Sequence, residues 1–250
     1  MFLEKKFMMR RILSCLLYML FASCTSSKLI TVYTIGDSTM ANKKAEVYPE
    51  TGWGQVFQSC FDSKVKVSNH AMNGRSTKSF IDEGRWKPVF DSLKHGDYVF
   101  IKFGHNDEKS DKPAVFADAS TTYKQNLEKY ITDTRAKGAT PILLTSIIRR
   151  KFDELGKLVD THGKYPVAVR ELATKLNVKC IDMELLTKTL VNSLGDEPSK
   201  KLYLWTAPDA KFPEGRKDDT HLRVEGATTY ARLVAAEVAK MKTPLAKHVK

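Results

Sequence analysis

Four short segments contain the residue types that an acyl-transfer site needs: a nucleophile, a base, an acid that orients the base, and donors for an oxyanion. Ser38 is the candidate nucleophile, because it follows a Gly-Asp pair that suits a tight turn. His221 is the candidate base, and a short turn can bring the carboxylate of Asp218 back to its Nδ1. Asp219 lies inside the same block and stays open as the acid, although the spacing favours Asp218.

Three groups are candidate donors to an oxyanion: the backbone N–H of Ser38, the backbone N–H of Gly74 and the side-chain amide of Asn106. A glycine at position 74 lets the backbone approach a ligand closely. Each segment alone is weak evidence, because Gly, Asp, Asn and Ser also favour ordinary turns. Their placement strengthens the prediction, since three of the four segments directly follow expected strands. No Gly-x-Ser-x-Gly elbow is present, which disfavours the common α/β-hydrolase arrangement.

The elements that must position these side chains alternate between strands and helices. Apolar, β-branched runs predict strands at residues 29–35, 64–69, 97–103, 140–145 and 178–182. Apolar residues at helical spacing predict helices around residues 123–134, 169–176 and 230–241. The alternation predicts a parallel sheet covered on both faces, with the ligand at the carboxyl ends of the strands. Two polar stretches, residues 148–164 and 193–215, are expected to be long loops over one end of the sheet.

The first residues are typical of an export signal. Basic residues precede a short apolar run at residues 12–21, and small residues follow it. The run is shorter than the roughly 20 apolar residues that span a bilayer. We therefore expect residues 1–23 to be a signal peptide and residues 24–250 to form a single esterase domain, exported to the periplasm or cell surface. The segment before Cys24 resembles a lipoprotein processing site, which implies a lipid anchor on Cys24. Cleavage with release is the alternative, because Phe21 stands where Leu is usual.

Composition and charge narrow the partners. Hydrophobic residues make up 42% and charged residues 28% of the chain, as in ordinary globular proteins. The first 23 residues carry four bases and one acid, so a chain without them has a net charge of +9, against +12 for all 250 residues. This balance favours an anionic partner. The basic residues are scattered and resemble no nucleic-acid motif, so nucleic acid is not expected as a partner.

Two cysteines follow the expected anchor site. We expect Cys60 and Cys180 to be two buried thiols, and pairing in an oxidising compartment is the alternative. Two cysteines without clustered histidines make no metal site. We expect His105 and Asp107 to hold the loop around Asn106 by hydrogen bonds, rather than to take part in the reaction. The remaining histidines are expected to be surface or structural residues: His70, His95, His162 and His248.

Together the four segments resemble the four blocks of the SGNH, or GDSL-like, hydrolase family, and they extend from residue 36 to residue 221. In that family the blocks supply a catalytic Ser, an oxyanion Gly, an oxyanion Asn and a catalytic His. The corresponding residues here are Ser38, Gly74, Asn106 and His221, with Asp218 as the third triad member. The resemblance implies an α/β fold, namely a three-layer α/β/α arrangement with a flavodoxin-like parallel sheet. It also implies no metal or organic cofactor.

Within the family, the residues around the blocks are similar to those of the rhamnogalacturonan acetylesterases. The similar stretches are residues 36–41, 52–55, 74–76, 79–80, 83–86, 96–99 and 103–107. The resemblance implies a carbohydrate esterase that hydrolyses O-acetyl groups from a plant cell-wall polysaccharide such as pectin. It implies carboxylate contacts from Arg75, Lys78 and Arg85, and a sugar-stacking platform at Trp86. The structural alternatives are that Arg85 braces a loop and that Trp86 belongs to the core.

Other functions stay open at this point. The same triad serves acetylxylan esterases and lipid or thioester hydrolases, but the polar residues at the strand ends disfavour an apolar acyl groove. A non-catalytic, surface glycan-binding lipoprotein is an alternative of another class. Such a protein would not require all five residues of the expected triad and oxyanion hole together. We expect the protein to act as a monomer on an acetylated polysaccharide or oligosaccharide, with membrane contact only through Cys24.

Overall fold

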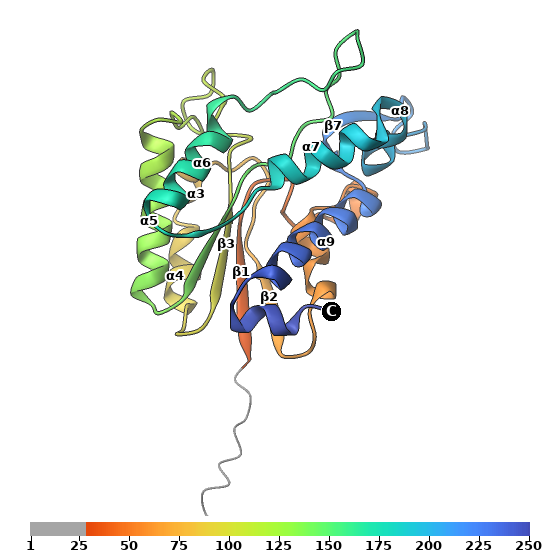
Figure 1. Ribbon diagram of the computed structural model, residues 1–250. Helices are drawn as coiled ribbons and strands as arrows, with labels where there is room; N and C mark the ends of the chain where they lie inside the picture. Colours follow the sequence, from red (N-terminus) through yellow and green to blue (C-terminus); the bar gives the residue numbers. More distant parts are fainter. Residues whose placement is uncertain (1–28) are drawn as a thin grey trace, which may run out of the picture.

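Five parallel strands form the central sheet, in the order β2-β1-β3-β4-β5 (Figure 1). They appear in a computed structural model that describes residues 29–250, so the expected signal peptide and Cys24 lie outside the described residues. The strands are β1 (Ile30–Gly36), β2 (Val65–Asn69), β3 (Tyr98–Lys102), β4 (Thr140–Leu144) and β5 (Lys179–Ile181). Each begins and ends within two residues of its predicted range, and the strand order is that of a flavodoxin-like sheet.

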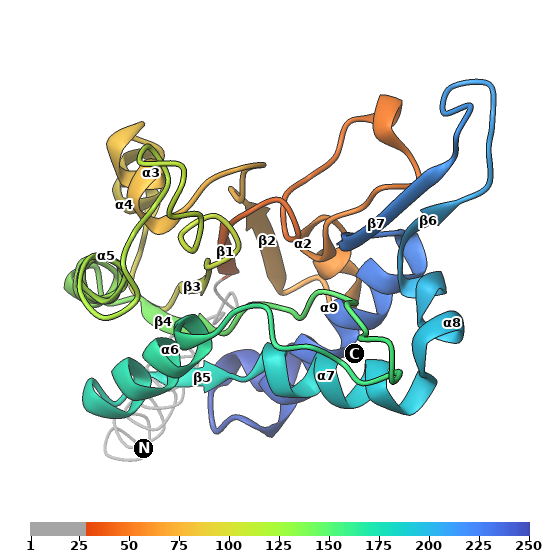
Figure 2. The same cartoon turned by 90° about the horizontal axis from the view of Figure 1, so that it is seen from above.

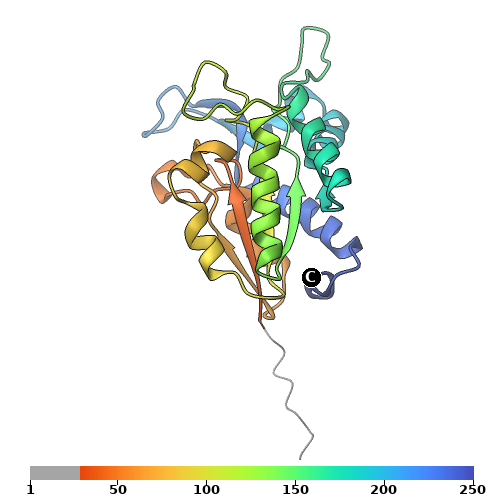
Figure 3. The ribbon, with the colours of Figure 1, turned by 90° about the vertical axis from the view of Figure 1, so that its left-hand side faces the viewer.

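Side chains that alternate along the strands fill two separate cores. On β3, Tyr98 and Phe100 enter one buried cluster, whereas Val99 and Ile101 enter the other. The second cluster is covered by α3 (Thr77–Asp82), α4 (Trp86–Ser92), α5 (Thr122–Ala136) and α6 (Lys164–Lys175). The first is covered by α2 (Trp53–Val56), α7 (Met183–Leu194), α9 (Val224–Lys240) and the short 3-10 segments η2 (Phe57–Cys60) and η4 (Pro244–His248). Figures 1 and 3 show the resulting three-layer α/β/α arrangement, which confirms the expected fold class.

A second, two-stranded antiparallel sheet follows the central one. It consists of β6 (Tyr203–Thr206) and β7 (Arg216–Leu222), and is preceded by α8 (Asp196–Ser199) and η3 (Lys200–Leu202). The prediction of a long loop over residues 193–215 was therefore wrong for much of its length. The apolar run in β6 is short and polar residues flank it, so the strand is defined by its pairing with β7. Residues 148–163 do form a loop, as predicted, and α6 begins at Lys164.

The connecting segments gather at the carboxyl edge of the sheet. Figure 2 looks down on this edge, with the segments after β1, β3 and β4 and the β6–β7 hairpin around it. Cys60 and Cys180 are free thiols that pack against opposite faces of the sheet, so they do not pair. Across residues 29–250, no helix is long and apolar enough to cross a membrane.

Candidate active site

Ser38 lies in a tight turn directly after β1. The backbone carbonyl of Asp37 accepts hydrogen bonds from the N–H groups of Met40 and Ala41, at 3.2 and 3.1 Å. Gly52, at the start of α2, packs on this turn so closely that a Cβ there would lie 2.1 Å from the carbonyl oxygen of Ala41. Any side chain at position 52 would therefore displace the segment that carries the nucleophile.

Asp218 and His221 both lie on β7, where an irregularity in strand pairing brings them together. Leu204 pairs with Asp218, and the preceding residue, Tyr203, pairs with Leu222, so the three residues between 218 and 222 have no partner on β6. Such bulges re-aim side chains near active sites. The carboxylate Oδ1 of Asp218 accepts the N–H groups of Thr220 and His221, at 2.8 and 2.9 Å. The sequence predicted a short turn that brings Asp218 to His221, and the structure forms that turn within β7.

The three predicted triad side chains form one chain of hydrogen bonds. Asp218 Oδ2 lies 2.7 Å from His221 Nδ1, and His221 Nε2 lies 2.9 Å from Ser38 Oγ. Because the carboxylate of Asp218 can only accept, His221 Nδ1 carries the proton and donates it to Asp218. His221 Nε2 is then free to accept from the seryl hydroxyl. Burial alone would raise the pKa of Asp218, but the side chain and backbone N–H of His221 and the N–H of Thr220 hold it well below its usual range. Asp218 is therefore a carboxylate at any pH near neutrality.

The alternative acid, Asp219, has other partners. Its Oδ1 accepts from Arg150 Nε and from Trp205 Nε1, each at 2.7 Å, and its backbone carbonyl accepts the N–H of Arg150 at 2.8 Å. These bonds anchor β7 to the loop after β4. Only Asp218 is hydrogen-bonded to His221, as the spacing favoured.

The expected oxyanion donors follow three neighbouring strands of the sheet: Ser38 follows β1, Gly74 follows β2 and Asn106 follows β3. The structure provides no acceptor among residues 29–250 for the backbone N–H of Ser38 or of Gly74. Gly74 has a φ of +76°, which favours glycine, and nothing lies within 4 Å of the position of a Cβ. Glycine is thus required here by the backbone conformation, and the space beside it is open to a ligand.

Asn106 is oriented by hydrogen bonds at both ends of its amide. Its Nδ2 donates to the carbonyl of Arg75 at 3.0 Å, and its Oδ1 accepts from Lys109 Nζ at 2.7 Å. The side chain is almost fully buried. Because the oxygen is occupied by an ammonium group, the amide nitrogen is the end that remains for an oxyanion, with its second N–H.

The predicted substrate contacts have different outcomes. Trp86 was wrongly predicted as a sugar-stacking platform: only 5% of it is exposed, its ring packs edge-on against Tyr130, and its Nε1 donates to Asp133 Oδ2 at 2.8 Å. Its hydrophobic burial in the core under α4 leaves no face for a sugar. Arg75 and Arg85 share one carboxylate as their partner, that of Glu83, and both side chains are about one-third exposed.

Lys78 forms an ion pair with Asp82 one turn along α3, at 3.2 Å. The charges of Arg75, Lys78 and Arg85 are thus all partly neutralised within the protein. Contacts from these three residues to a substrate carboxylate remain a prediction.

A chain of ion pairs at the rim was missed in the sequence. Glu50 binds Arg216 of β7 and Lys43, each at 2.8 Å, and Lys43 also donates to Asn73 Oδ1 at 2.8 Å. Burial alone would raise the pKa of Glu50, but Lys43 and Arg216 hold it below its ordinary value. These bonds tie β7, the segment before α2 and the residue preceding Gly74 to one another. No local pattern connects these distant positions, so the sequence carries no signal for the cluster.

The neighbouring histidines have structural partners. His105 is buried, and its Nδ1 lies 3.2 Å from Asp37 Oδ2. His162 is buried as well, and it bonds Glu108 Oε2 and the carbonyl of Ile147, each at 2.9 Å. These contacts hold the loops after β3 and β4, which agrees with the structural role expected for both residues.

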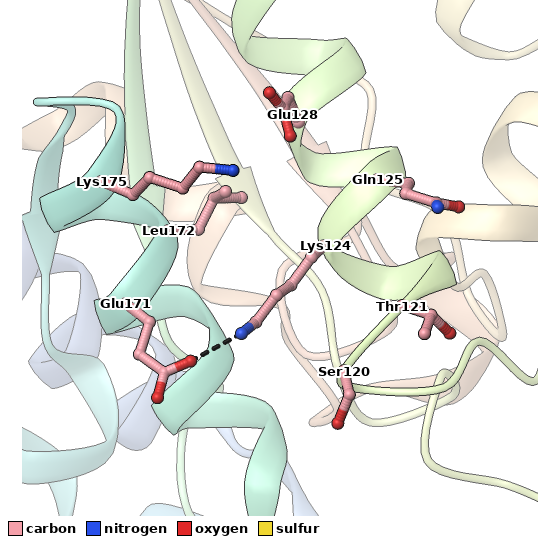
Figure 4. Close-up of a pocket in the computed structure, with 8 residues that line it drawn as sticks. All are labelled: Ser120, Thr121, Lys124, Gln125, Glu128, Glu171, Leu172 and Lys175. Atoms are coloured by element: carbon pink, nitrogen blue, oxygen red, sulfur yellow. Dashed lines mark hydrogen bonds and ion pairs between the residues drawn. The ribbon is translucent and has the colours of Figure 1, made fainter.

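A pocket of about 420 Å³ lies apart from the triad, between α5 and α6 (Figure 4). Lys124 and Glu171 form an ion pair across it, at 2.6 Å. Its lining contains none of the predicted site residues, so the candidate chemistry remains at the carboxyl edge of the sheet. Among residues 29–250, no group of three or more His, Cys, Asp or Glu side chains is arranged to hold a metal ion.

A seryl hydroxyl, an imidazole and a carboxylate in one hydrogen-bonded chain, at the carboxyl edge of a flavodoxin-like sheet, form the triad of a serine hydrolase. The chain belongs to the GDSL-like lipase/acylhydrolase family, whose sequence profile matches residues 34–228. This match includes every residue of the expected triad and oxyanion hole.

Named relatives lie in the same family. The chain is 40% identical over 224 residues to the rhamnogalacturonan acetylesterase RhgT of Bacillus subtilis (strain 168), covering 89% of this chain and 95% of that protein. It is 28% identical over 220 residues to a rhamnogalacturonan acetylesterase of Emericella nidulans, covering 80% and 81%. Among solved structures, the B. subtilis protein YxiM superposes with a TM-score of 0.72 at 27% identity, over 84% of this chain and 56% of that one. An acetylxylan esterase of Geobacillus stearothermophilus, Axe2, shares the fold, with a TM-score of 0.62 at 19% identity, over 84% and 94%.

Proposed function

We propose that this protein is a carbohydrate acetylesterase that removes O-acetyl groups from rhamnogalacturonan, with Ser38 as nucleophile. The observation that carries the mechanism is the continuous hydrogen-bonded chain from Ser38 Oγ through His221 to Asp218. The substrate class is supported by the 40% identity to RhgT over nearly the full length of both chains.

The proposed reaction has two halves. Ser38 Oγ attacks the acetyl carbonyl carbon while its proton passes to His221 Nε2, and the carbonyl oxygen becomes an oxyanion that faces the Ser38 and Gly74 N–H groups and the Asn106 amide. The C–O bond to the sugar then breaks, and the sugar oxygen takes the proton from His221. In the second half, water gives a proton to His221 and attacks the acetyl-Ser38 ester. The bond from the acetyl carbon to Ser38 Oγ then breaks, Oγ takes the proton from His221, and acetate leaves.

The test is acetate release from three substrates by the wild type and by Ser38→Ala: acetylated rhamnogalacturonan, acetylated xylan and a long-chain ester. We expect release from the pectic polymer, and loss of that release in the variant. Ser38-dependent hydrolysis of only the xylan or the long-chain ester would retain the mechanism and reject the substrate. Release that is as fast in Ser38→Ala as in the wild type would reject the mechanism.

We also propose that the protein is exported and that a lipid on Cys24 anchors it to a membrane. The support is the sequence of the first 24 residues. Its apolar run, followed by small residues and Cys24, is typical of a lipoprotein processing site. Expression of the full chain in a bacterium fed with labelled palmitate tests this proposal. Label in the membrane fraction should be lost in Cys24→Ser, and an unlabelled, released wild-type protein would contradict the anchor.

A further inference from the structure

Beneath the Ser38 turn lies a lysine that is completely enclosed. Lys102 ends β3, and its side chain and that of Asp37 are both 0% exposed. The ammonium nitrogen binds both carboxylate oxygens of Asp37, at 2.8 and 2.9 Å, and also donates to Thr39 Oγ1. One residue on each side of the proposed nucleophile is therefore bonded directly to Lys102.

The hydrogen bonds of this cluster define its protonation. Asp37 and Thr39 accept all three N–H donors of Lys102, so none remains for His105 Nδ1, which lies 3.2 Å from Lys102 Nζ. His105 Nδ1 therefore carries a proton and donates it to Asp37 Oδ2. His105 Nε2 then carries a lone pair, and it has no partner among the described residues. Burial, followed by the charge of Lys102, holds the pKa of His105 well below its ordinary value, so His105 is neutral. The cluster is a single ion pair with a neutral imidazole beside it.

Stability alone does not explain why an ion pair is buried beneath Ser38. Apolar side chains of similar volume often stabilise a fold as well as a buried pair does, because removing two charges from water is costly. The geometry supplies another reason here. Asp37 Oδ1 accepts the N–H and the hydroxyl of Thr39, at 3.0 and 2.9 Å, and the Asp37 carbonyl closes the turn over Ser38. Those bonds to Oδ1 are strongest when Asp37 is ionised, because a carboxylate is a better acceptor than a neutral carboxyl group.

We infer that Lys102 is a positioning residue, whose ammonium group keeps Asp37 as a carboxylate and so holds the Asp37–Thr39 turn in the conformation that aims Ser38 at His221. The role rests on the proposed function of Ser38 as nucleophile. It predicts an effect on the rate of acylation at Ser38, and none on the binding of substrate, because Lys102 is enclosed and contacts no open surface.

Ionisation of Asp37 depends on its surroundings. Burial would raise the pKa of Asp37, but Lys102 and then His105 hold it well below its usual range. Other charged or titratable groups act on the cluster from the adjacent loops, namely Asp107, Glu108, Arg149 and His162. When Lys102 is replaced by an apolar residue, burial dominates and the pKa of Asp37 rises. At lower pH the Asp37 carboxyl group then holds a proton and accepts hydrogen bonds less well. As pH rises it loses the proton and regains its strength as an acceptor.

Two variants separate this role from general stability. Lys102→Met leaves Asp37 buried without its counterion, and Lys102→Met combined with Asp37→Asn removes both charges. Lys66→Met is the matched control, because Lys66 is an exposed lysine on the neighbouring strand β2. Each protein is assayed across about pH 5 to 9 for labelling of Ser38 by a fluorophosphonate and for kcat and KM on an acetyl ester, with urea unfolding alongside.

In Lys102→Met we expect the labelling rate and kcat to be lower by ~10²-fold near neutral pH, with KM unchanged. Both rates should also rise with pH more steeply than those of the wild type. The double variant has no group to titrate at position 37, so its pH profile should regain the wild-type shape, with a rate lower by about tenfold. Lys66→Met should match the wild type.

A folded Lys102→Met that is labelled at the wild-type rate, with the wild-type pH profile, overturns the inference. Should Lys102→Met fail to fold, the double variant decides: a reduced rate with unchanged KM and normal unfolding supports positioning, and a wild-type rate overturns it. Failure of the proposed function is distinct, because the wild type itself would then not be labelled at Ser38.

Discussion

The amide of Asn106 is held from both sides, and this affects how well it can stabilise an oxyanion. The ammonium group of Lys109 bonds its oxygen, and the Arg75 carbonyl takes one of its N–H groups. A charged donor on the oxygen fixes which way the amide faces and polarises the N–H that remains. We therefore expect Lys109 to act on the proposed reaction through Asn106.

We expect Lys109→Met to lower kcat by about tenfold and to leave KM nearly unchanged, because the amide loses its fixed orientation. Asn106→Ala should lower kcat by about 10²–10³-fold, as the loss of one oxyanion donor does elsewhere. In the Asn106→Ala background, Lys109→Met should have no further effect. An undiminished effect there, or a change confined to KM, would show that Lys109 acts on the substrate directly.

Single residues differ in how far the sequence reveals them. Ser38 and His221 were recognisable because their types and neighbouring residues resemble the blocks of one hydrolase family. Lys102 was overlooked, although a lone lysine in an otherwise apolar strand signals a buried charge with a partner. Trp86 was misassigned, because the sequence does not say which face of a short helix is covered.

At the scale of elements, Trp86 joins α4 to α5. Its ring packs on Tyr130 and its Nε1 reaches Asp133, both on α5. We expect Trp86→Ala to lower the free energy of unfolding by about 3–5 kcal/mol, the usual cost of removing a large buried aromatic, with KM unchanged. Urea unfolding and steady-state kinetics measure the two effects. Arg85→Ala, next in sequence but partly exposed, is the control and should scarcely affect unfolding. A raised KM in Trp86→Ala at unchanged stability would restore Trp86 as a sugar contact.

Another link between elements depends on pH. Asp107, in the loop after β3, accepts the N–H and hydroxyl of Thr77 at the start of α3, at 2.8 and 2.5 Å. Burial raises the pKa of Asp107 from 3.8 to about 7. The folded protein therefore holds the carboxyl proton of Asp107 more tightly than the unfolded chain does. The stabilisation of the fold that this proton provides is fully present below pH 3.8 and is lost as pH rises towards 7.

We expect Asp107→Asn to gain stability relative to the wild type as pH rises through this window, because asparagine keeps the acceptor oxygen without the proton equilibrium. Urea midpoints of both proteins at about pH 5 and 8 measure the change. Asp111→Asn, which alters an exposed carboxyl group in the same loop, should show no such trend. A difference between Asp107→Asn and the wild type that is the same at both pH values would contradict the assigned titration.

The inner strands β1, β3 and β4 were predictable because they are largely buried and rich in apolar residues. The bulge on β7 was not, since it exists only through the pairing of Leu204 with Asp218 and of Tyr203 with Leu222. Spacing alone allowed Asp218 to reach His221. It did not show that a strand would hold the turn, or that Arg150 would bind Asp219 and so leave Asp218 to His221.

At the scale of the whole molecule, charge is the property most relevant to a polymeric substrate. Residues 24–250 carry a net charge of +9, and the proposed polymer is a polyanion. Long-range attraction of this kind raises the local concentration of substrate and adds little to the chemical step. It also weakens with salt, since the Debye length falls from about 10 Å at 0.1 M to about 3 Å at 1 M.

We therefore expect added salt to raise KM for acetylated rhamnogalacturonan several-fold between about 0.05 and 0.5 M NaCl, with kcat nearly constant. A small neutral acetyl ester, hydrolysed by the same Ser38, is the control and should show no change in KM. The comparison isolates the polymer's charge, because both substrates use the same triad and oxyanion donors. Equal salt dependence for the two substrates would mean that salt acts on the enzyme itself. A polymer KM that does not respond to salt would mean that the scattered lysines are only a solvated surface, and that recognition depends on short-range contacts at the rim of the site.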